Sequence, residues 1–155
     1  MEQIVINGQR ILSGNVHISG AKNAAVAIIP AAIAANGVSI IENLPRIEDV
    51  IILANAIKSI GVACEFKNDH TLIVDSRNVK DFRITYDMTR NMRASYYLIG
   101  ALLGRFKRAV VPLPGGCNFG SRPIDQHIKG FEAMGARIIL KHGLIHAYAE
   151  KLTGS

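Results

Sequence analysis

The stretch Pro112 to Ile128, PLPGGCNFGSRPIDQHI, organises the rest of the chain. Its glycines and prolines suit neither a helix interior nor a central strand, so the stretch predicts a loop. Cys117 lies in the middle of this loop and Arg122 near its end, where Pro123 suits the first turn of a following helix. A thiol beside an arginine and a helix N-terminus is a setting that lowers the pKa of the thiol and attracts anions. The same residues are also compatible with a surface turn that holds an ordinary cysteine.

The composition indicates a globular protein that favours anionic partners. Hydrophobic residues make up 49% of the 155 positions and charged residues 19%, which allows a sizeable core and disfavours disorder. The formal net charge is +6, but the basic residues are scattered and Trp is absent. A nucleic-acid-binding surface is therefore disfavoured. A small anionic substrate explains the positive charge at least as well.

The cysteines and the apolar segments limit the class of protein further. Cys64 and Cys117 have neither the number nor the spacing of a disulfide framework or a metal site, so we expect no metal and no cofactor. The start of the chain, MEQIVING, is typical of a strand rather than a secretory leader. The longest apolar run, 24–35, is too short to span a bilayer. We expect a cytoplasmic protein without a membrane partner.

The hydrophobic pattern predicts an alternation of helices and strands. We expect the 21–35 helix to be kinked or broken at Pro30. Thr89 is the expected N-cap of a later helix, which Gly104 would close. We expect helices at 21–35, 48–60, 89–103 and 123–134, and strands at 3–6, 16–18, 38–42, 62–66, 71–75, 109–113, 136–140 and 144–149.

The order helix, strand, helix ending in glycine, hairpin occurs twice. The segment SIGVA at 59–63 matches AMGAR at 133–137, which indicates an internal repeat of roughly seventy residues. In the first copy a tight turn at 43–45 joins strand to helix. The second copy carries the insertion 115–122 at that point. A loop gained at one junction of a repeat favours a functional site there.

Three cations each lie beside the start of a predicted helix: Lys22, Arg93 and Arg122. Each alone is compatible with an ordinary surface residue. If the helix starts converge, the three form a cationic bowl for a multiply charged anion. Asp125 has a favourable place for the helix dipole, and its side chain is equally able to accept from a base or a sugar hydroxyl.

The role of the loop thiol stays open at this level. Cys117 has no local His-Asp relay, so it is a candidate nucleophile, general acid or structural thiol. His127 lies inside the following helix and is expected at the surface. Cys64 lies in a strand between apolar neighbours, and we expect it in the core.

Three segments resemble a known family: ISGAKNA at 18–24, TRNMRAS at 89–95, and LPGGC at 113–117 followed by GSRP at 120–123. They are similar, in the same order, to UDP-N-acetylglucosamine 1-carboxyvinyltransferases. The resemblance implies a fold of the α/β (α+β) class, the inside-out α/β barrel built from βαβαββ repeats, incomplete here. Residues 21–88 would be the first repeat and 89–155 the second. Residues 1–20 would belong to the other domain of the family.

The resemblance also implies a reaction and its residues. The enolpyruvyl group of phosphoenolpyruvate would move to the 3′-hydroxyl of UDP-N-acetylglucosamine with release of phosphate, the first committed step of peptidoglycan synthesis. Cys117 would be the general acid. Lys22, Asn23 and Arg122 would bind phosphoenolpyruvate, with Asn23 on this substrate or on the UDP-sugar. The UDP-sugar site would be lined by Arg93, Arg122, Pro123, Ile124, Asp125 and Gln126.

The chain departs from this family in length, since family members are usually more than twice as long. We therefore expect an N-terminal portion that does not turn over alone and that self-associates through the face left by a missing repeat. Two alternatives stay open: a non-catalytic module that binds UDP-sugars or anions, and a transferase related to enolpyruvylshikimate-phosphate synthase. An anion- or nucleic-acid-binding domain resting on the net charge is a third and weaker alternative.

Overall fold

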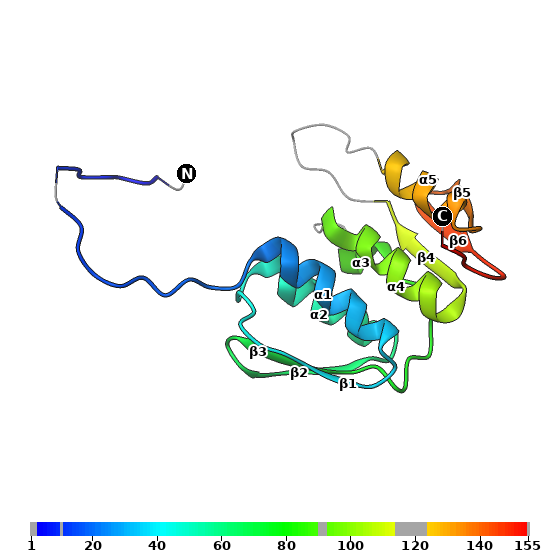
Figure 1. The fold of residues 1–155 in the computed structure, drawn as a ribbon, viewed down its shortest axis with the longest axis horizontal. Coiled ribbons are helices and arrows are strands. Elements are labelled where there is room, and N and C mark those ends of the chain that lie inside the picture. Colours follow the sequence, from blue (N-terminus) through cyan, green and yellow to red (C-terminus); the bar gives the residue numbers. More distant parts are fainter. Residues whose placement is uncertain (1–2, 10, 90–92, 114–123, 155) are drawn as a thin grey trace.

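A computed structural model describes residues 3–9, 11–89, 93–113 and 124–154. These residues form a mixed α/β fold with two three-stranded antiparallel sheets and helices packed against them (Figure 1). The helices are α1 (Lys22–Ala34), α2 (Glu48–Ser59), α3 (Tyr86–Thr89), the 3₁₀ helix η1 (Arg93–Tyr96), α4 (Tyr97–Phe106) and α5 (Asp125–Ala133). The strands are β1 (Val38–Ile41), β2 (Ala63–Asn68), β3 (Thr71–Asp75), β4 (Arg108–Pro112), β5 (Arg137–Lys141) and β6 (Leu144–Tyr148).

The two sheets have the same strand order, β1-β3-β2 and β4-β6-β5. In each sheet the second strand of the hairpin lies in the centre. Its neighbours are the first strand of the same hairpin and the strand that precedes the hairpin in sequence. The hairpin β5–β6 turns through His142 and Gly143, whose φ angles of 51° and 73° are those of a type I′ turn. Both hairpins were predicted from the alternating apolar pattern, and both are confirmed.

Helix α1 packs against α2 and α4. Its interior-facing side chains Val26, Ile29 and Ile33 are buried in the core. The predicted break at Pro30 is wrong, because α1 continues through this residue to Ala34. A proline removes a single backbone hydrogen bond, and apolar packing on either side of Pro30 offsets that loss.

The helix ends follow from the local sequence. Helix α2 has Glu48 and Asp49 in its first turn and Lys58 in its last, as the helix dipole favours. Gly61 follows it with φ 94°, and Gly135 follows α5 with the same angle. The predicted glycine stops after these two helices are confirmed, because this backbone conformation is open to glycine and strained for other residues.

The predicted 89–103 helix is wrong at both ends. Thr89 is the last residue of the short helix α3 rather than an N-cap, and η1 and α4 follow. At the other end α4 runs past Gly104 to Phe106, and Lys107 closes it in the left-handed conformation with φ 59°. The N–H of Lys107 donates to the oxygen of Leu103. This hydrogen bond gives a backbone carbonyl in the last turn of α4 the partner that we expected a terminal glycine to provide.

The predicted strands at 3–6 and 16–18 are also wrong, since the structure has no strand among residues 3–9 and 11–20. This segment extends away from the body of the molecule (Figure 1). Its large apolar side chains are 73–101% exposed: Ile4, Val5, Ile6, Ile11, Leu12, Val16 and Ile18. An alternating sequence becomes a strand only when a neighbouring strand accepts its hydrogen bonds, and the segment has no such neighbour among the described residues.

A short parallel pairing extends the second sheet at the edge formed by β4. The N–H of Ile84 donates to the oxygen of Val110, and the N–H of Val110 donates to the oxygen of Phe82. This bridge brings the segment before α3 alongside β4. This pairing was not predicted, because the segment is too short to show an alternating pattern.

Candidate functional site

The start of α1 is held against the turn that follows β1. A Cβ on Gly20 would clash with the backbone oxygen of Asn43, so only glycine fits at this point. The turn itself is fixed by His70, whose Nδ1 donates to the oxygen of Leu44 at 2.9 Å. The oxygen of His70 also accepts from the N–H of Leu44. These contacts set the position of Lys22, the first residue of α1.

The predicted anion-binding residues Lys22 and Asn23 lie in the exposed first turn of α1. The residue before the helix, Ala21, makes no side-chain cap, and the first turn holds no acidic residue. The amide N–H groups of this turn therefore have no partner within the helix, and they carry the positive end of the dipole. Together with an ammonium group they are suited to a phosphate or a carboxylate.

Lys22 has a partner that the sequence did not predict. Its ammonium forms an ion pair with the carboxylate of Asp49 in the first turn of α2. The side chain of Lys22 is 57% exposed and that of Asp49 21%. The only sequence signal for Asp49 was its place in the first turn of a helix, which the dipole alone explains.

A second group of predicted residues lies at the start of α5. Ile124 is buried and precedes the helix, whereas Asp125 and Gln126 are exposed in its first turn. The side-chain amide of Gln126 donates to Oδ2 of Asp125 at 3.1 Å. The two side chains thus present a linked set of polar atoms to solvent, with acceptors and a further amide proton available to a ligand.

Aromatic contacts bring η1 beside the start of α5. The ring of His127 lies 4.8 Å from the ring of Tyr96, measured between centroids, and Tyr96 in turn lies 4.7 Å from Tyr97. Arg93 opens η1, so its backbone belongs to the element that contacts α5. The predicted surface position of His127 is confirmed. Its ring also packs on Tyr96, which the sequence did not indicate.

The remaining predicted site residues lie outside the described part of the chain. These are Cys117, Arg122 and Pro123, together with the side chain of Arg93.

The other cysteine is confirmed as a core residue. Cys64 is 7% exposed, and its Sγ donates to the oxygen of Ala54 at 3.3 Å. Burial raises the pKa of this thiol, an effect that the charge of Lys58 partly opposes. A buried thiol with a raised pKa is a poor nucleophile, so Cys64 is unsuited to chemistry.

An open cleft of about 340 Å³ lies between α2 and the β2–β3 hairpin and shares no residue with the predicted site. Arg46 and Asp69 form an exposed ion pair at this cleft. Its lining is Arg46, Ile51, Ala54, Asn55, Lys58, Phe66, Asn68 and Asp69. Within the described ranges no cluster of three or more His, Cys, Asp or Glu side chains could hold a metal ion. No helix in the same ranges is long and apolar enough to cross a membrane.

Sequence comparison identifies close relatives. UDP-N-acetylglucosamine 1-carboxyvinyltransferase 3 of Caldanaerobacter subterraneus subsp. tengcongensis is 52% identical over 155 residues. UDP-N-acetylglucosamine 1-carboxyvinyltransferase 2 of Bacillus subtilis is 50% identical over the same length. Each alignment covers 100% of this chain but only 37% and 36% of the relative. The chain thus spans little more than a third of the length of these relatives, and the resemblance read from its motifs is confirmed.

Structural comparison points to the same group of folds. The enolpyruvyl transferase NikO from Streptomyces tendae superposes with a TM-score of 0.75 at 26% identity, covering 92% of this chain and 31% of that one. EPSP synthase from Acinetobacter baumannii superposes with a TM-score of 0.65 at 19% identity, covering 92% and 33%. The predicted fold class, an incomplete fold of the enolpyruvyl transferase type, is confirmed.

A family model described as EPSP synthase (3-phosphoshikimate 1-carboxyvinyltransferase) matches residues 6–153, nearly the whole chain. With the relatives and the fold in agreement, the chain belongs to the EPSP synthase family.

Proposed function

We propose that this chain contributes half of a substrate cleft for enolpyruvyl transfer from phosphoenolpyruvate to the 3′-hydroxyl of UDP-N-acetylglucosamine. Phosphate is released, and the product enters peptidoglycan synthesis in the cytoplasm. The observation that carries the proposal is the start of α1, where Lys22 stands on an uncapped helix N-terminus fixed by Gly20. Relatives 50–52% identical to the whole chain are named for this reaction.

In this proposal the first substrate is held by cations. Lys22 and Arg122 bind the phosphate and carboxylate of phosphoenolpyruvate, and Asn23 contacts this substrate or the UDP-sugar. Cys117 donates its thiol proton to the methylene carbon of the enol while positive charge develops at C2. The sugar hydroxyl then adds at C2 and releases its proton. Phosphate leaves together with one proton of the new methyl group, and the enol ether forms. Cationic anchors are suited to this chemistry because both substrates are anions.

The UDP-sugar is proposed to lie along the start of α5. The residues are Arg93 and the stretch Arg122, Pro123, Ile124, Asp125 and Gln126. The linked side chains of Asp125 and Gln126 and the aromatic contact between η1 and α5 support this part of the proposal. No nucleic acid takes part.

We also propose that 21–88 and 89–155 are two copies of one βαβαββ unit, and that 1–20 belong with the other domain of the family. The equal strand order of the two sheets supports this division. Alone, the chain should not turn over, because a closed two-domain site is needed to align the substrates and exclude water. Self-association through an apolar face that a further repeat would cover is expected.

The test is intact-mass spectrometry after exposure to an epoxide phosphonate, with and without UDP-N-acetylglucosamine. The expected result is one adduct that maps to Cys117 and changes in rate with the UDP-sugar, while Cys64 stays unmodified as an internal control. Equal labelling of both cysteines, or no effect of the UDP-sugar, would count against a formed half-site. A phosphate-release assay with both substrates should give no turnover.

A second candidate is a transferase acting on a shikimate phosphate, favoured by the description of the matching family. Titration with shikimate 3-phosphate and with UDP-N-acetylglucosamine separates the two candidates. A non-catalytic UDP-sugar module would show saturable binding with no selective adduct at Cys117.

A further inference from the structure

The ion pair between Lys22 and Asp49 joins two helices at the proposed anion site. Lys22 opens α1, and Asp49 lies in the first turn of α2, which packs against α1. The two side chains come from elements separated by β1 and its turn, so no helical spacing produces this contact. It exists only because the fold brings the two helix starts together.

The carboxylate is the fixed member of this pair. Asp49 is helical, its side chain is 21% exposed, and the N-terminal end of α2 favours a negative charge at this point. The Lys22 side chain is 57% exposed and ends a flexible stem with several rotatable bonds. Without a partner, the ammonium group would sample many positions around the start of α1.

We propose that Asp49 is a positioning residue for anion binding: it holds the Lys22 ammonium over the open N-terminus of α1. This inference rests on the proposed role of Lys22 in binding phosphoenolpyruvate. An ammonium has three N–H donors, so a contact with Asp49 leaves donors for an oxyanion. Because the pair already orders the lysine, less side-chain freedom is lost when the anion arrives.

The opposite effect of Asp49 is repulsion of the anion by its charge. If repulsion dominated, removing the carboxylate would tighten anion binding. Both members of the pair are reached by solvent, and water and salt weaken the interaction of charges that do not touch. Positioning acts through direct contact, which water and salt weaken less than they weaken repulsion at longer range, so we expect positioning to decide the sign.

The experiment is isothermal titration of the 155-residue chain with phosphoenolpyruvate, repeated with four variants. We expect Asp49→Asn to weaken binding about fivefold, part of the affinity that ordering a lysine stem can contribute. Asp49→Glu keeps the charge and should restore affinity to within about twofold of the unaltered chain. In a Lys22→Gln background, Asp49→Asn should have no further effect, because the residue through which it acts is gone. Asp69→Asn removes the carboxylate of the matched exposed pair with Arg46 and should leave binding unchanged.

Each outcome separates this inference from the function on which it rests. Binding lost in Lys22→Gln but kept or tightened in Asp49→Asn overturns the positioning role alone. Equal binding by the unaltered chain and Lys22→Gln, or no binding by either, overturns the anion role of Lys22 and this inference with it. Amine acetylation followed by mass spectrometry adds a ligand-free readout. Asp49→Asn should raise labelling of Lys22 relative to Lys58, and an unchanged ratio overturns the positioning role.

Discussion

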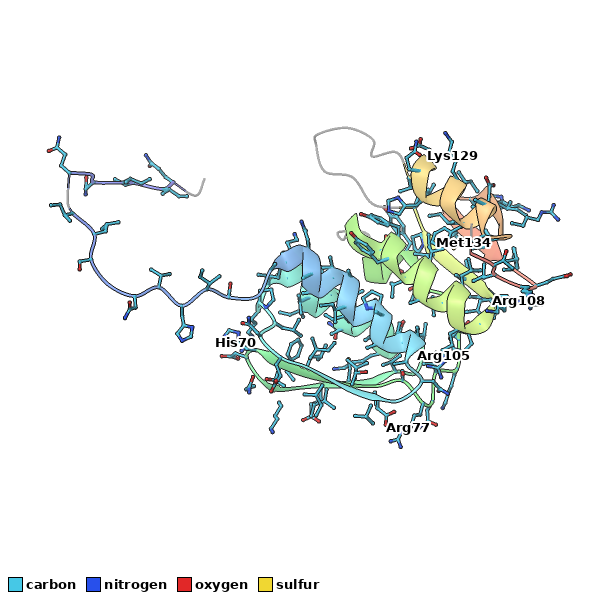
Figure 2. The ribbon with its side chains drawn as sticks, in the orientation of Figure 1. His70, Arg77, Arg105, Arg108, Lys129 and Met134 are labelled. Carbon is cyan, nitrogen blue, oxygen red and sulfur yellow. The ribbon has the colours of Figure 1, made fainter. Side chains whose placement is uncertain are left out.

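Arg105 of α4 donates from Nη1 to the backbone oxygen of Ile33, 72 positions earlier in the chain and 2.7 Å away. The same guanidinium donates to the oxygen of Ser76 and to Oδ1 of Asn36, each at 2.6 Å. The last carbonyl groups of a helix have no partner within it, and Arg105 supplies one at the end of α1. Figure 2 shows Arg105 at this end of the helix. One side chain therefore ties α4 to α1 and to the segment after β3.

Replacing Arg105 should destabilise the fold as a whole. We expect Arg105→Ala to lower the free energy of unfolding by about 2–3 kcal/mol, because hydrogen bonds from a charged donor contribute more than neutral ones. Arg105→Lys should lose most of this stabilisation, since an ammonium cannot reproduce the planar arrangement of donors of a guanidinium. Urea unfolding followed by circular dichroism measures the change. Arg108→Ala, at an exposed position in β4, is the control and should cost less than about 0.5 kcal/mol. Equal effects of the two substitutions would contradict this assignment.

Replacing two different glycines with alanine should change the free energy of unfolding in opposite directions. Gly61 has φ 94°, and a Cβ there would lie 3.0 Å from the oxygen of Asn78. We expect Gly61→Ala to lower the free energy of unfolding by about 1–2 kcal/mol. Gly104 lies inside α4 with no heavy atom within 4 Å of an added Cβ. Gly104→Ala should therefore raise the free energy of unfolding by about 0.5–1 kcal/mol. Chemical denaturation of both variants tests the pair, and destabilisation by both would refute the prediction for Gly104.

Cys64 should resist alkylation while the chain is folded. Burial raises the pKa of its thiol, and reaction with iodoacetamide requires the thiolate. We expect labelling of Cys64 only after unfolding, measured by peptide mass mapping.

The raised pKa of Cys64 also makes the stability of the fold pH-dependent. Above the ordinary thiol pKa of about 8.5 the unfolded chain ionises while the folded chain keeps its proton, so the free energy of unfolding falls as pH rises. Cys64→Ala should remove this part of the pH dependence.

Asp75 should stay ionised to a lower pH than an ordinary aspartate. Arg77 donates to its carboxylate from Nε at 2.9 Å and from Nη2 at 2.7 Å, and these bonds lower the pKa of Asp75 to about 2. A pKa lowered by folding adds stability above the ordinary value of about 4, and this stability is lost as pH falls towards 2. Carbon NMR of the carboxyl group follows the titration. Arg77→Gln should raise the pKa of Asp75, whereas Arg83→Gln should leave it unchanged.

Sequence reasoning located most elements because their signals are local. The alternating strands of each hairpin and the amphipathic helices each have a recognisable hydrophobic pattern, and the glycine after α2 is a local stop signal. It failed where the structure of a segment depends on contacts with residues elsewhere in the chain. The N-terminal segment has a strand pattern but no neighbouring strand in the described part of the chain, and Thr89 resembles an N-cap but ends α3. Likewise Lys107, not glycine, takes the left-handed position after α4, because its own N–H finds the oxygen of Leu103.

The candidate site shows the same division between local and tertiary signals. Lys22 and Asp125 were found from their places at helix starts, which is a local property. Asp49 was missed as a partner of Lys22 because their contact depends on how α1 and α2 pack. The contact between Tyr96 and His127 was missed for the same reason, since it joins η1 to α5.

The exposed aliphatic side chains of the segment before α1 have a consequence inside a cell. Extended, apolar, accessible backbone is what holdase chaperones and processive proteases recognise, and this segment offers it for as long as no other domain covers it, without any unfolding of the body. The folded body behind it can be fully stable and still be turned over quickly. Cellular lifetime of this chain would then be set by how these first residues are covered, and not by the strength of the core.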